Sequence, residues 1–243
     1  MSIHPSAIVH PDARVDDDAE IGPFCVVGAE VTIGARTRLK GHVFVEGPSW
    51  IGEDNLFYPF SSIGVASQDL KYQGERAETR IGNRNLIREF VTIHRGTQGG
   101  GLVTSVGDDN LLMAYTHVAH DCHIGSHCVL ANATTLGGHV TVADYARIGA
   151  FSGVHQFCRI GAHSMIGGYS VITRDVAPYS TTSEEREAKL YRANSVGLER
   201  RGFSQEAING LNKAFRFLRD PELNTAKAVE KMRAEISSSE ELE

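Results

Sequence analysis

The feature that most constrains this chain is an aliphatic or large apolar residue at every sixth position. The series runs over Val9–Ile63 and resumes in the same phase over Ile81–Ile93. It restarts one residue out of phase and then continues unbroken over Val106–Ile172, often with glycine directly after the apolar residue. A period of six fits neither an amphipathic helix nor one long strand. It indicates short strands joined by tight turns.

Hexapeptide repeats of this kind are typical of a parallel β-helix. Three hexads form one triangular coil, so residues about 18 apart stack at the inter-strand spacing of about 4.8 Å. The position four after each apolar residue holds mainly small side chains, which suggests a second inward-facing slot. That slot includes all four cysteines, Cys25, Cys122, Cys128 and Cys158. We therefore expect a mainly β fold with an axial aliphatic core, and cysteines that are buried small residues, with no disulfide or metal role.

Two segments interrupt the repeat, near residues 65–80 and 95–105. Long excursions from a regular scaffold usually carry function, so we expect both to be binding loops. The hexad pattern ends after Ile172, and the composition becomes charged from about residue 183. This predicts a β-helical domain over residues 1–182 and a small helical domain over residues 183–243.

The helical domain has recognisable start signals. Ser204 is a candidate N-cap for a helix that ends before Pro221, and a second helix is expected from about Thr225. The predicted apolar faces are Ile208, Leu211, Phe215 and Leu218 in the first helix, and Val229, Met232 and Ile236 in the second.

The net charge of -6 and the pI of about 6.0 argue against a general binder of nucleic acid or anionic membranes, because both need a basic surface. The sequence has no apolar run long enough to span a membrane and no leader-like N-terminus. We therefore expect a cytoplasmic protein without a membrane span.

A short stretch, THVAHDC at residues 116–122, carries two histidines and an aspartate outside the inward slots. The repeat stacks these side chains with those of later coils. The sets spaced by 18 residues are His120, Gly138 and Gln156, and also Asp121 and His139. For each histidine taken alone, a solvated position on the surface is the alternative interpretation. The clustering of the histidines with Asp121 favours a functional site.

Two kinds of chemistry fit this cluster. A metal centre needs three or four convergent ligands and an open position; the hexapeptide fold hosts zinc in γ-class carbonic anhydrases, but the His-x-x-His spacing here is narrower than theirs. Proton transfer needs an imidazole, an acid that fixes its tautomer, and a donor for developing negative charge. His120, Asp121 and the backbone N–H of Gly138 fit those three parts, so the sequence favours proton transfer without a metal.

Six ordered segments resemble one known family. They are QDLKY (68–72), TIHRGT (92–97), GGGLVTSVGDDNLLM (99–113), HVAHDC (117–122), GVHQFCRIGAH (153–163) and GLERRGFS (197–204). Together they resemble the bacterial UDP-N-acetylglucosamine O-acyltransferases. The resemblance covers nearly the whole chain and implies a left-handed parallel β-helix with a small α-helical C-terminal domain. It also implies a homotrimer with active sites in clefts between subunits.

The resemblance implies a reaction as well. An (R)-3-hydroxyacyl chain would pass from acyl carrier protein to the glucosamine 3-hydroxyl of UDP-N-acetylglucosamine (UDP-GlcNAc), the first step of lipid A biosynthesis, with no cofactor. The alternatives are an N-acyltransferase acting on a UDP-3-amino-sugar, a sugar O-acetyltransferase, and a non-catalytic β-helix scaffold. The related N-acyltransferase normally has an extra N-terminal domain, for which hexads that begin at Val9 leave no room.

The family's site residues carry over by position. The general base, its orienting acid and the oxyanion donor would be His120, Asp121 and Gly138. Substrate contacts would come from Gln68, Asp69, Lys71, His94, His117, His139 and Gln156. Nucleotide contacts would come from Asn194, Arg200 and Arg201.

Gly168 matches the floor of the acyl-chain site in this family, and its lack of a side chain implies room for a long chain such as hydroxymyristoyl. Lys213, Arg216 and Arg219 are candidates for docking the acidic carrier protein, with an ordinary charged helix face as the alternative. Val196 departs from the pattern, in which an acidic residue lies near the nucleotide.

Overall fold

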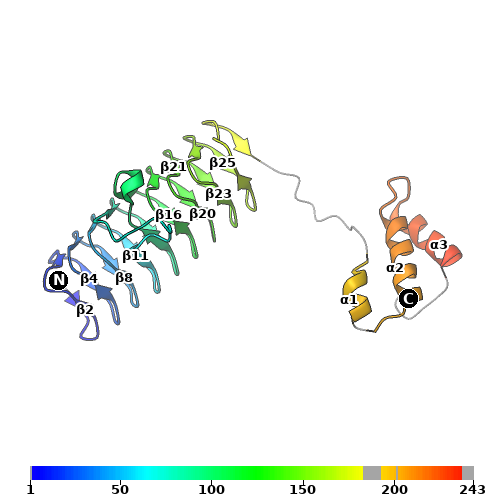
Figure 1. Cartoon of the computed structure of the whole chain (residues 1–243), viewed down its shortest axis with the longest axis horizontal. Helices are drawn as coiled ribbons and strands as arrows, with labels where there is room; N and C mark the ends of the chain where they lie inside the picture. The colour runs from blue at the N-terminus through cyan, green and yellow to red at the C-terminus, as the bar shows by residue number, and fades with distance from the viewer. Residues whose placement is uncertain (1, 183–192, 201, 237–243) are drawn as a thin grey trace. The chain divides into compact units, whose positions relative to one another are not determined.

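The computed structural model describes residues 2–182, 193–200 and 202–236 (Figure 1). The chain divides into two compact units, Met1–Glu184 and Glu185–Glu243. The first unit consists of short parallel strands with one 3-10 turn, η1 (Gln98–Gly100), and the second contains helices. Among the helices of the described residues, none combines the length and the apolar composition that spanning a bilayer requires.

The first unit is a left-handed parallel β-helix with three sheets, as predicted. The first sheet holds β1 (Ser2–Ile3), β4 (Glu20–Ile21), β7 (Arg38–Leu39), β10 (Leu56–Phe57), β13 (Leu86–Ile87), β16 (Leu111–Leu112), β19 (Val129–Leu130), β22 (Arg147–Ile148), β25 (Met165–Ile166) and β27 (Thr181–Thr182). The second holds β2 (Ile8–Val9), β5 (Val26–Val27), β8 (Phe44–Val45), β11 (Ser62–Val65), β14 (Thr92–His94), β17 (His117–Val118), β20 (Thr135–Leu136), β23 (Gly153–Val154) and β26 (Val171–Ile172). The third holds β3 (Arg14–Val15), β6 (Val31–Ile33), β9 (Ser49–Ile51), β12 (Glu78–Ile81), β15 (Val103–Val106), β18 (His123–Ile124), β21 (Thr141–Val142) and β24 (Arg159–Ile160).

Successive coils stack in register along this unit, from blue to yellow in Figure 1. Regular coils pair residues 18 apart, as in Ser2 with Glu20. The loop between β11 and β12 lengthens one coil, so Leu56 pairs with Leu86, and the loop between β14 and β15 lengthens the next, so Leu86 pairs with Leu111. The second of these offsets is one residue more than a whole number of hexads. That extra residue explains why the apolar series restarts out of phase.

The core follows the predicted slots. The hexad positions are almost completely shielded from solvent, for example in Ile21, Leu39, Phe57, Ile87, Leu112 and Leu136. The second slot is buried too, and all four cysteines in it are buried and unpaired. The column continues past the last hexad at Ile172, since Val176 is 8% exposed and bridges to Ile160, and β27 pairs with β25 inside the predicted domain of residues 1–182.

The turns form three edges of the column. We call the turns from the first to the second sheet the first edge, those from the second to the third sheet the second edge, and those from the third to the first sheet the third edge. Most turns place one residue in the left-handed backbone region, such as Asp54 at φ 57° and Asp121 at φ 58°. Because equivalent turn residues stack coil on coil, like side chains form ladders. On the first edge the stacked rings are Phe24, His42, Phe60, Phe90 and Tyr115.

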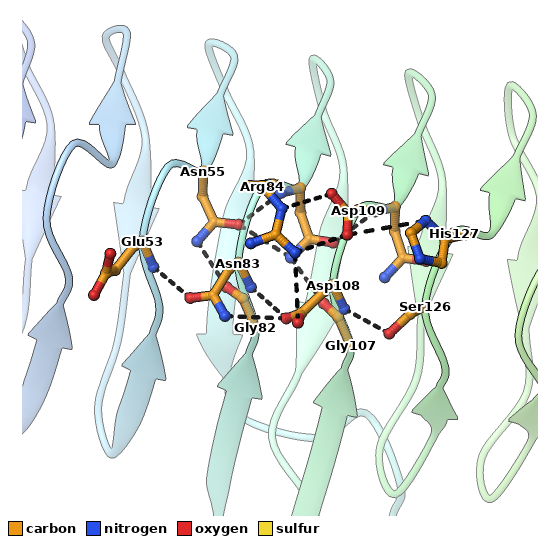
Figure 2. Close-up of polar contacts among 12 residues, drawn as sticks. Glu53, Asn55, Gly82, Asn83, Arg84, Gly107, Asp108, Asp109, Ser126 and His127 are labelled. Carbon is orange, nitrogen blue, oxygen red and sulfur yellow. Dashed lines mark hydrogen bonds and ion pairs between the residues drawn. The ribbon is translucent and has the colours of Figure 1, made fainter.

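The third edge carries a polar ladder (Figure 2). Asn55, Asn85 and Asn110 are buried in the second inward slot, where each bonds to its neighbours in adjacent coils. Outside them, Arg84 makes two hydrogen bonds to Asp109 at 2.7 and 2.8 Å. The buried amides thus link coils on the inside, while ion pairs link them on the outside.

The second unit contains α1 (Ser195–Arg200), α2 (Gln205–Leu218) and α3 (Thr225–Glu235). Ser204 caps α2 as predicted, because its side chain accepts a hydrogen bond from the Ala207 N–H at 3.1 Å. The predicted apolar faces are partly wrong, since Leu218 and Val229 are exposed. The buried residues of α2 and α3 are Ala207, Ile208, Ala214, Phe217 and Ala228. The helix α1 was not expected from the sequence.

Candidate active site

The predicted histidine cluster lies on the second edge, in the turns that follow β17, β20 and β23. The backbone stacks these turns in the predicted register. His139 N donates to His120 O at 3.1 Å, and Phe157 N donates to Gly138 O at 3.0 Å. The spacing of 18 residues therefore brings His120, Gly138 and Gln156 into consecutive coils, as the repeat predicted.

His120 and Asp121 form a close pair. The Nδ1 atom of His120 lies 2.8 Å from Oδ2 of Asp121. The Asp121 side chain is fully shielded from solvent, whereas 12% of the His120 side chain is exposed. A carboxylate that accepts the Nδ1–H bond leaves the lone pair of the imidazole on Nε2. The pair has the geometry of an imidazole whose tautomer is fixed by an acid.

Gly138 lies directly against the imidazole. A Cβ added to Gly138 would be 2.6 Å from Nε2 and 2.5 Å from Cε1 of His120, so only glycine fits here without moving the ring. Within the described residues the Gly138 N–H has no hydrogen-bond acceptor. A free backbone donor next to a base is an arrangement that stabilises developing negative charge.

His139 completes this side of the cluster. Its ring stacks on Phe157 with centroids 4.4 Å apart and meets the His120 ring edge-on at 5.0 Å. Its Nδ1 lies 4.0 Å from Oδ2 of Asp121. Burial lowers the pKa of His139, and the neighbouring Asp121 charge opposes that shift.

Two further histidines line the same cleft as His120. They are His94 on β14 and His117 on β17. Burial lowers the pKa of His94 to about 4, with smaller contributions from His117 and His120. His117 also has a lowered pKa, mainly through burial, and its Nδ1 lies 2.7 Å from Oγ1 of Thr92. Both rings are therefore mainly neutral at pH 7, so neither adds a positive charge to the cleft.

The first loop, defined here as residues 66–77, faces the histidines across an open cleft of about 480 Å³. Oδ2 of Asp69 lies 3.9 Å from Nε2 of His120, on the side of the ring opposite Asp121. The lining brings together most of the predicted substrate-binding residues. It consists of Gln68, Asp69, Leu70, Lys71, His94, His117, Ala119, His120 and Gln156.

Other predicted residues lie elsewhere. Asn194 and Arg200 are exposed in the second unit, and Arg201 lies outside the described residues. Oδ1 of Asn194 accepts a hydrogen bond from the Gly197 N–H at 3.2 Å, so this side chain also caps α1. Gly168 lies on the first edge, where an added Cβ would be 2.9 Å from the Ala150 carbonyl oxygen.

The C-terminal candidates lie on the helices of the second unit. Lys213 of α2 forms an ion pair with Glu235 of α3 at 3.3 Å, so one of the three predicted docking cations is engaged within the unit. Arg216 and Val196 are exposed. The predicted roles of Lys213, Arg216 and Arg219 stay predictions.

The sequence interpretation missed Thr97, which contacts Asp121 through both its backbone N–H and its hydroxyl. The glycine-rich loop that contains Thr97 was the feature of the sequence that could have pointed to it. The hexad spacing does not relate Thr97 to Asp121, because the loop lies outside the repeat.

Three side chains of the cluster lie close enough together to bind a metal ion. His120, Asp121 and His139 offer ligand atoms within 4.8 Å of one another. However, the Asp121 carboxylate already accepts two hydrogen bonds from Thr97 and one from His120. A cation would have to compete with these three hydrogen bonds for the carboxylate oxygens. The expectation of a metal-free site stays a prediction.

Family models match both units. Residues 104–138 and 139–174 match the bacterial transferase hexapeptide (six repeats), and residues 175–243 match domain 2 of UDP N-acetylglucosamine O-acyltransferase. A relative from Thermodesulfovibrio yellowstonii, an acyl-[acyl-carrier-protein]--UDP-N-acetylglucosamine O-acyltransferase, is 48% identical over 206 residues, which is 85% of this chain and 80% of that protein.

Solved structures give the same result. The UDP-N-acetylglucosamine O-acyltransferase of Moraxella catarrhalis is 43% identical with a TM-score of 0.75, over 96% of this chain and 91% of that one. The UDP-N-acetylglucosamine acyltransferase of Francisella novicida is 39% identical with a TM-score of 0.75, over 96% of this chain and 86% of that one.

Proposed function

Because the chain belongs to the UDP-N-acetylglucosamine O-acyltransferase family, we propose that it transfers an (R)-3-hydroxyacyl chain from acyl carrier protein to the glucosamine 3-hydroxyl of UDP-GlcNAc. This is the first step of lipid A biosynthesis. The observation that carries the proposal is the His120–Asp121 pair, which faces an open cleft beside the free Gly138 amide.

His120 acts as the general base. With its Nδ1–H donated to Asp121, Nε2 accepts the proton of the sugar 3-hydroxyl while that oxygen attacks the thioester carbonyl. The Gly138 N–H stabilises the resulting tetrahedral oxyanion. When the carbon–sulfur bond breaks, the proton on Nε2 passes to the leaving thiolate of the carrier protein. The sequence of steps needs no metal and no covalent enzyme intermediate.

The other cleft residues bind and orient the substrates. We assign Gln68 and Asp69 to hydroxyl groups of the sugar or acyl chain, and Lys71 to a phosphate. The neutral histidines His94, His117 and His139, with Gln156, shape the cleft and contact the substrate. Asn194, Arg200 and Arg201 are assigned to the nucleotide, because a guanidinium fork matches phosphate oxygens.

The remaining parts of the proposal concern the assembly. The chain acts as a homotrimer in the cytoplasm, without a cofactor, since the acyl chain arrives on the carrier protein. Gly168 leaves room for a long acyl chain.

The test is acyl transfer from a panel of 3-hydroxyacyl carrier proteins to UDP-GlcNAc, with wild type and His120→Ala compared. We expect wild-type transfer and a loss of kcat in the variant of about 100-fold or more, the usual contribution of a general base. The matched control is His123→Ala, which removes an exposed histidine of β18 whose Nδ1 lies 2.8 Å from Oγ of Ser105.

Two results would contradict the proposal. A folded wild-type enzyme that leaves UDP-GlcNAc unmodified but acylates a UDP-3-amino-sugar would move the acceptor to the amine. Unchanged activity in His120→Ala would remove the general-base assignment and leave the family membership intact.

A further inference from the structure

The second loop, defined here as residues 95–102, closes over the Asp121 carboxylate. The Thr97 N–H donates to Oδ1 of Asp121 at 2.8 Å, and the Thr97 hydroxyl donates to Oδ2 at 2.6 Å. That same Oδ2 accepts the hydrogen bond from His120 Nδ1. Thr97 is itself buried, with 5% of its surface exposed. One threonine therefore holds both oxygens of the carboxylate that pairs with the imidazole.

Two glycines of the loop allow this close approach. A Cβ added to Gly100 would lie 2.0 Å from Cγ of Asp121, and one added to Gly96 would lie 2.9 Å from Oδ1. The neighbouring Gly99 is different, because its added Cβ would meet only the Thr97 hydroxyl, at 4.0 Å. The loop backbone is thus packed directly against the carboxylate.

Asp121 depends on these bonds. Within the described residues its carboxylate has no Lys or Arg at ion-pair distance, and its only such neighbours are the imidazoles of His120 and His139. A carboxylate shielded from water is costly unless hydrogen bonds stabilise it. The two donors of Thr97 supply that stabilisation, and Thr104 fixes the main chain by accepting the Asp121 N–H at 2.7 Å.

The loop is held in place before substrate arrives. The Thr97 carbonyl accepts hydrogen bonds from the N–H groups of Gly100 at 3.1 Å and Leu102 at 2.9 Å. Oε1 of Glu75 accepts the Gln98 N–H at 3.0 Å, which ties the second loop to the first. The backbone N–H groups of Gln98 and Gln73 hold the pKa of Glu75 below its usual value. Thr97 is therefore pre-organised by both loops.

We propose that Thr97 is a positioning residue of the acyl transfer, which acts through Asp121 to hold His120 in the tautomer and orientation that general-base catalysis needs. The inference rests on the proposed function, because it takes His120 as the base. Thr97 is buried and both of its donors bond to Asp121, so it acts without touching substrate. Losing its hydroxyl leaves Oδ1 bound to the Thr97 N–H but releases Oδ2, so the carboxylate can turn away from the Nδ1–H of His120.

The first test compares Thr97→Val, which keeps the side-chain shape and loses the hydroxyl, with Thr97→Ser, which keeps the hydroxyl. We expect kcat to fall about tenfold or more in Thr97→Val while KM for UDP-GlcNAc changes less than about twofold. Thr97→Ser should retain kcat within about threefold of wild type. The matched control is Thr37→Val, since Thr37 is equally buried and its hydroxyl donates to the Gly52 carbonyl at 2.7 Å, far from the cleft.

The second test compares substitutions of two neighbouring glycines of the second loop, Gly100 and Gly99. It tests the role of Thr97 even if Thr97→Val does not fold. Gly100→Ala should lower kcat about tenfold or more, because its methyl group displaces the Asp121 carboxylate. Gly99→Ala should retain wild-type kcat, because its methyl group meets only ordinary contacts. Melting temperatures of all variants separate a loss of catalysis from a loss of folded protein.

The outcomes distinguish this inference from the function on which it rests. If His120→Ala is inactive while folded Thr97→Val and Gly100→Ala keep wild-type kcat, the role of Thr97 is overturned and the general base stands. An equal loss in Thr97→Ser and Thr97→Val would also overturn it, because the hydroxyl would then not matter. If His120→Ala keeps full activity, the general base itself fails.

Discussion

His94 is the histidine at the cleft with the least exposed surface, 4%. Burial lowers its pKa to about 4 in the folded protein, whereas an unfolded chain has the ordinary value of about 6.5. Above pH 6.5 the ring is neutral in both states. As the pH falls below that value, the unfolded chain binds a proton that the native protein does not. The free energy of unfolding therefore decreases, by about 2 kcal/mol at pH 5.

This predicts that His94→Gln weakens the pH dependence of stability. We expect the difference in the free energy of unfolding between pH 7.5 and pH 5 to be smaller in the variant by about 2 kcal/mol, measured by urea denaturation. The control is His123→Gln, which replaces an exposed histidine of β18. Parallel pH profiles for wild type and His94→Gln would show that His94 is not the group responsible.

At the scale of single elements, the coils of the column are joined by an inner ladder of buried amides and an outer ladder of solvent-exposed ion pairs. On the third edge, Nδ2 of Asn85 donates to Oδ1 of Asn55 at 3.0 Å and to the Gly107 carbonyl at 2.9 Å. Its Oδ1 accepts the Asn110 N–H at 2.9 Å. The ion pair of Arg84 with Asp109 lies just outside, in contact with solvent (Figure 2).

We therefore predict that the inner ladder contributes more to stability than the outer one. Asn85→Leu leaves buried partners without hydrogen bonds and should lower the free energy of unfolding by about 2–4 kcal/mol. Arg84→Ala removes a solvated ion pair and should lower it by less than about 1 kcal/mol. Chemical denaturation of both variants gives the comparison, and a larger loss in Arg84→Ala would refute this ranking.

At the scale of the whole molecule, the middle of the first sheet is apolar on both faces, whereas Glu20, Arg38 and Arg147 lie in the outward row nearer its ends. The outward residues of the first sheet include Leu56, Leu86, Leu111 and Val129, each partly exposed in the single chain. The equivalent row of the third sheet is mostly polar, with Arg80, Ser105, His123, Thr141 and Arg159. A sheet that is apolar on both faces is typical of one covered on both sides. The first sheet is thus the surface on which the proposed trimer would assemble.

This predicts that Leu111→Glu dissociates the assembly, because association would bury an unpaired carboxylate. We expect light scattering to give three times the chain mass of 26.4 kDa for wild type and a mass close to one chain for the variant. Thr141→Glu places the same charge on the third sheet, and its mass should match wild type. A trimeric Leu111→Glu would exclude the first sheet as the interface.

The sequence by itself determined the column. A hexad period sets which side chains point inward and which turns stack, because each coil repeats the same local geometry. This is why the buried cysteines and the grouping of His120 with Gly138 and Gln156 could be predicted from spacing. The pairing of His120 with Asp121 was predicted separately, from what proton transfer requires of two adjacent residues.

Only the tertiary structure decided what the two loops do. Neither loop has a period, so spacing relates neither Thr97 to Asp121 nor Asp69 to His120, and both contacts depend on how the loops fold back onto the second edge. The helix faces of the second unit were mispredicted for a related reason. Helix periodicity gives the candidate faces, but the packing of α2 against α3 selects which side chains are buried, Phe217 instead of Leu218.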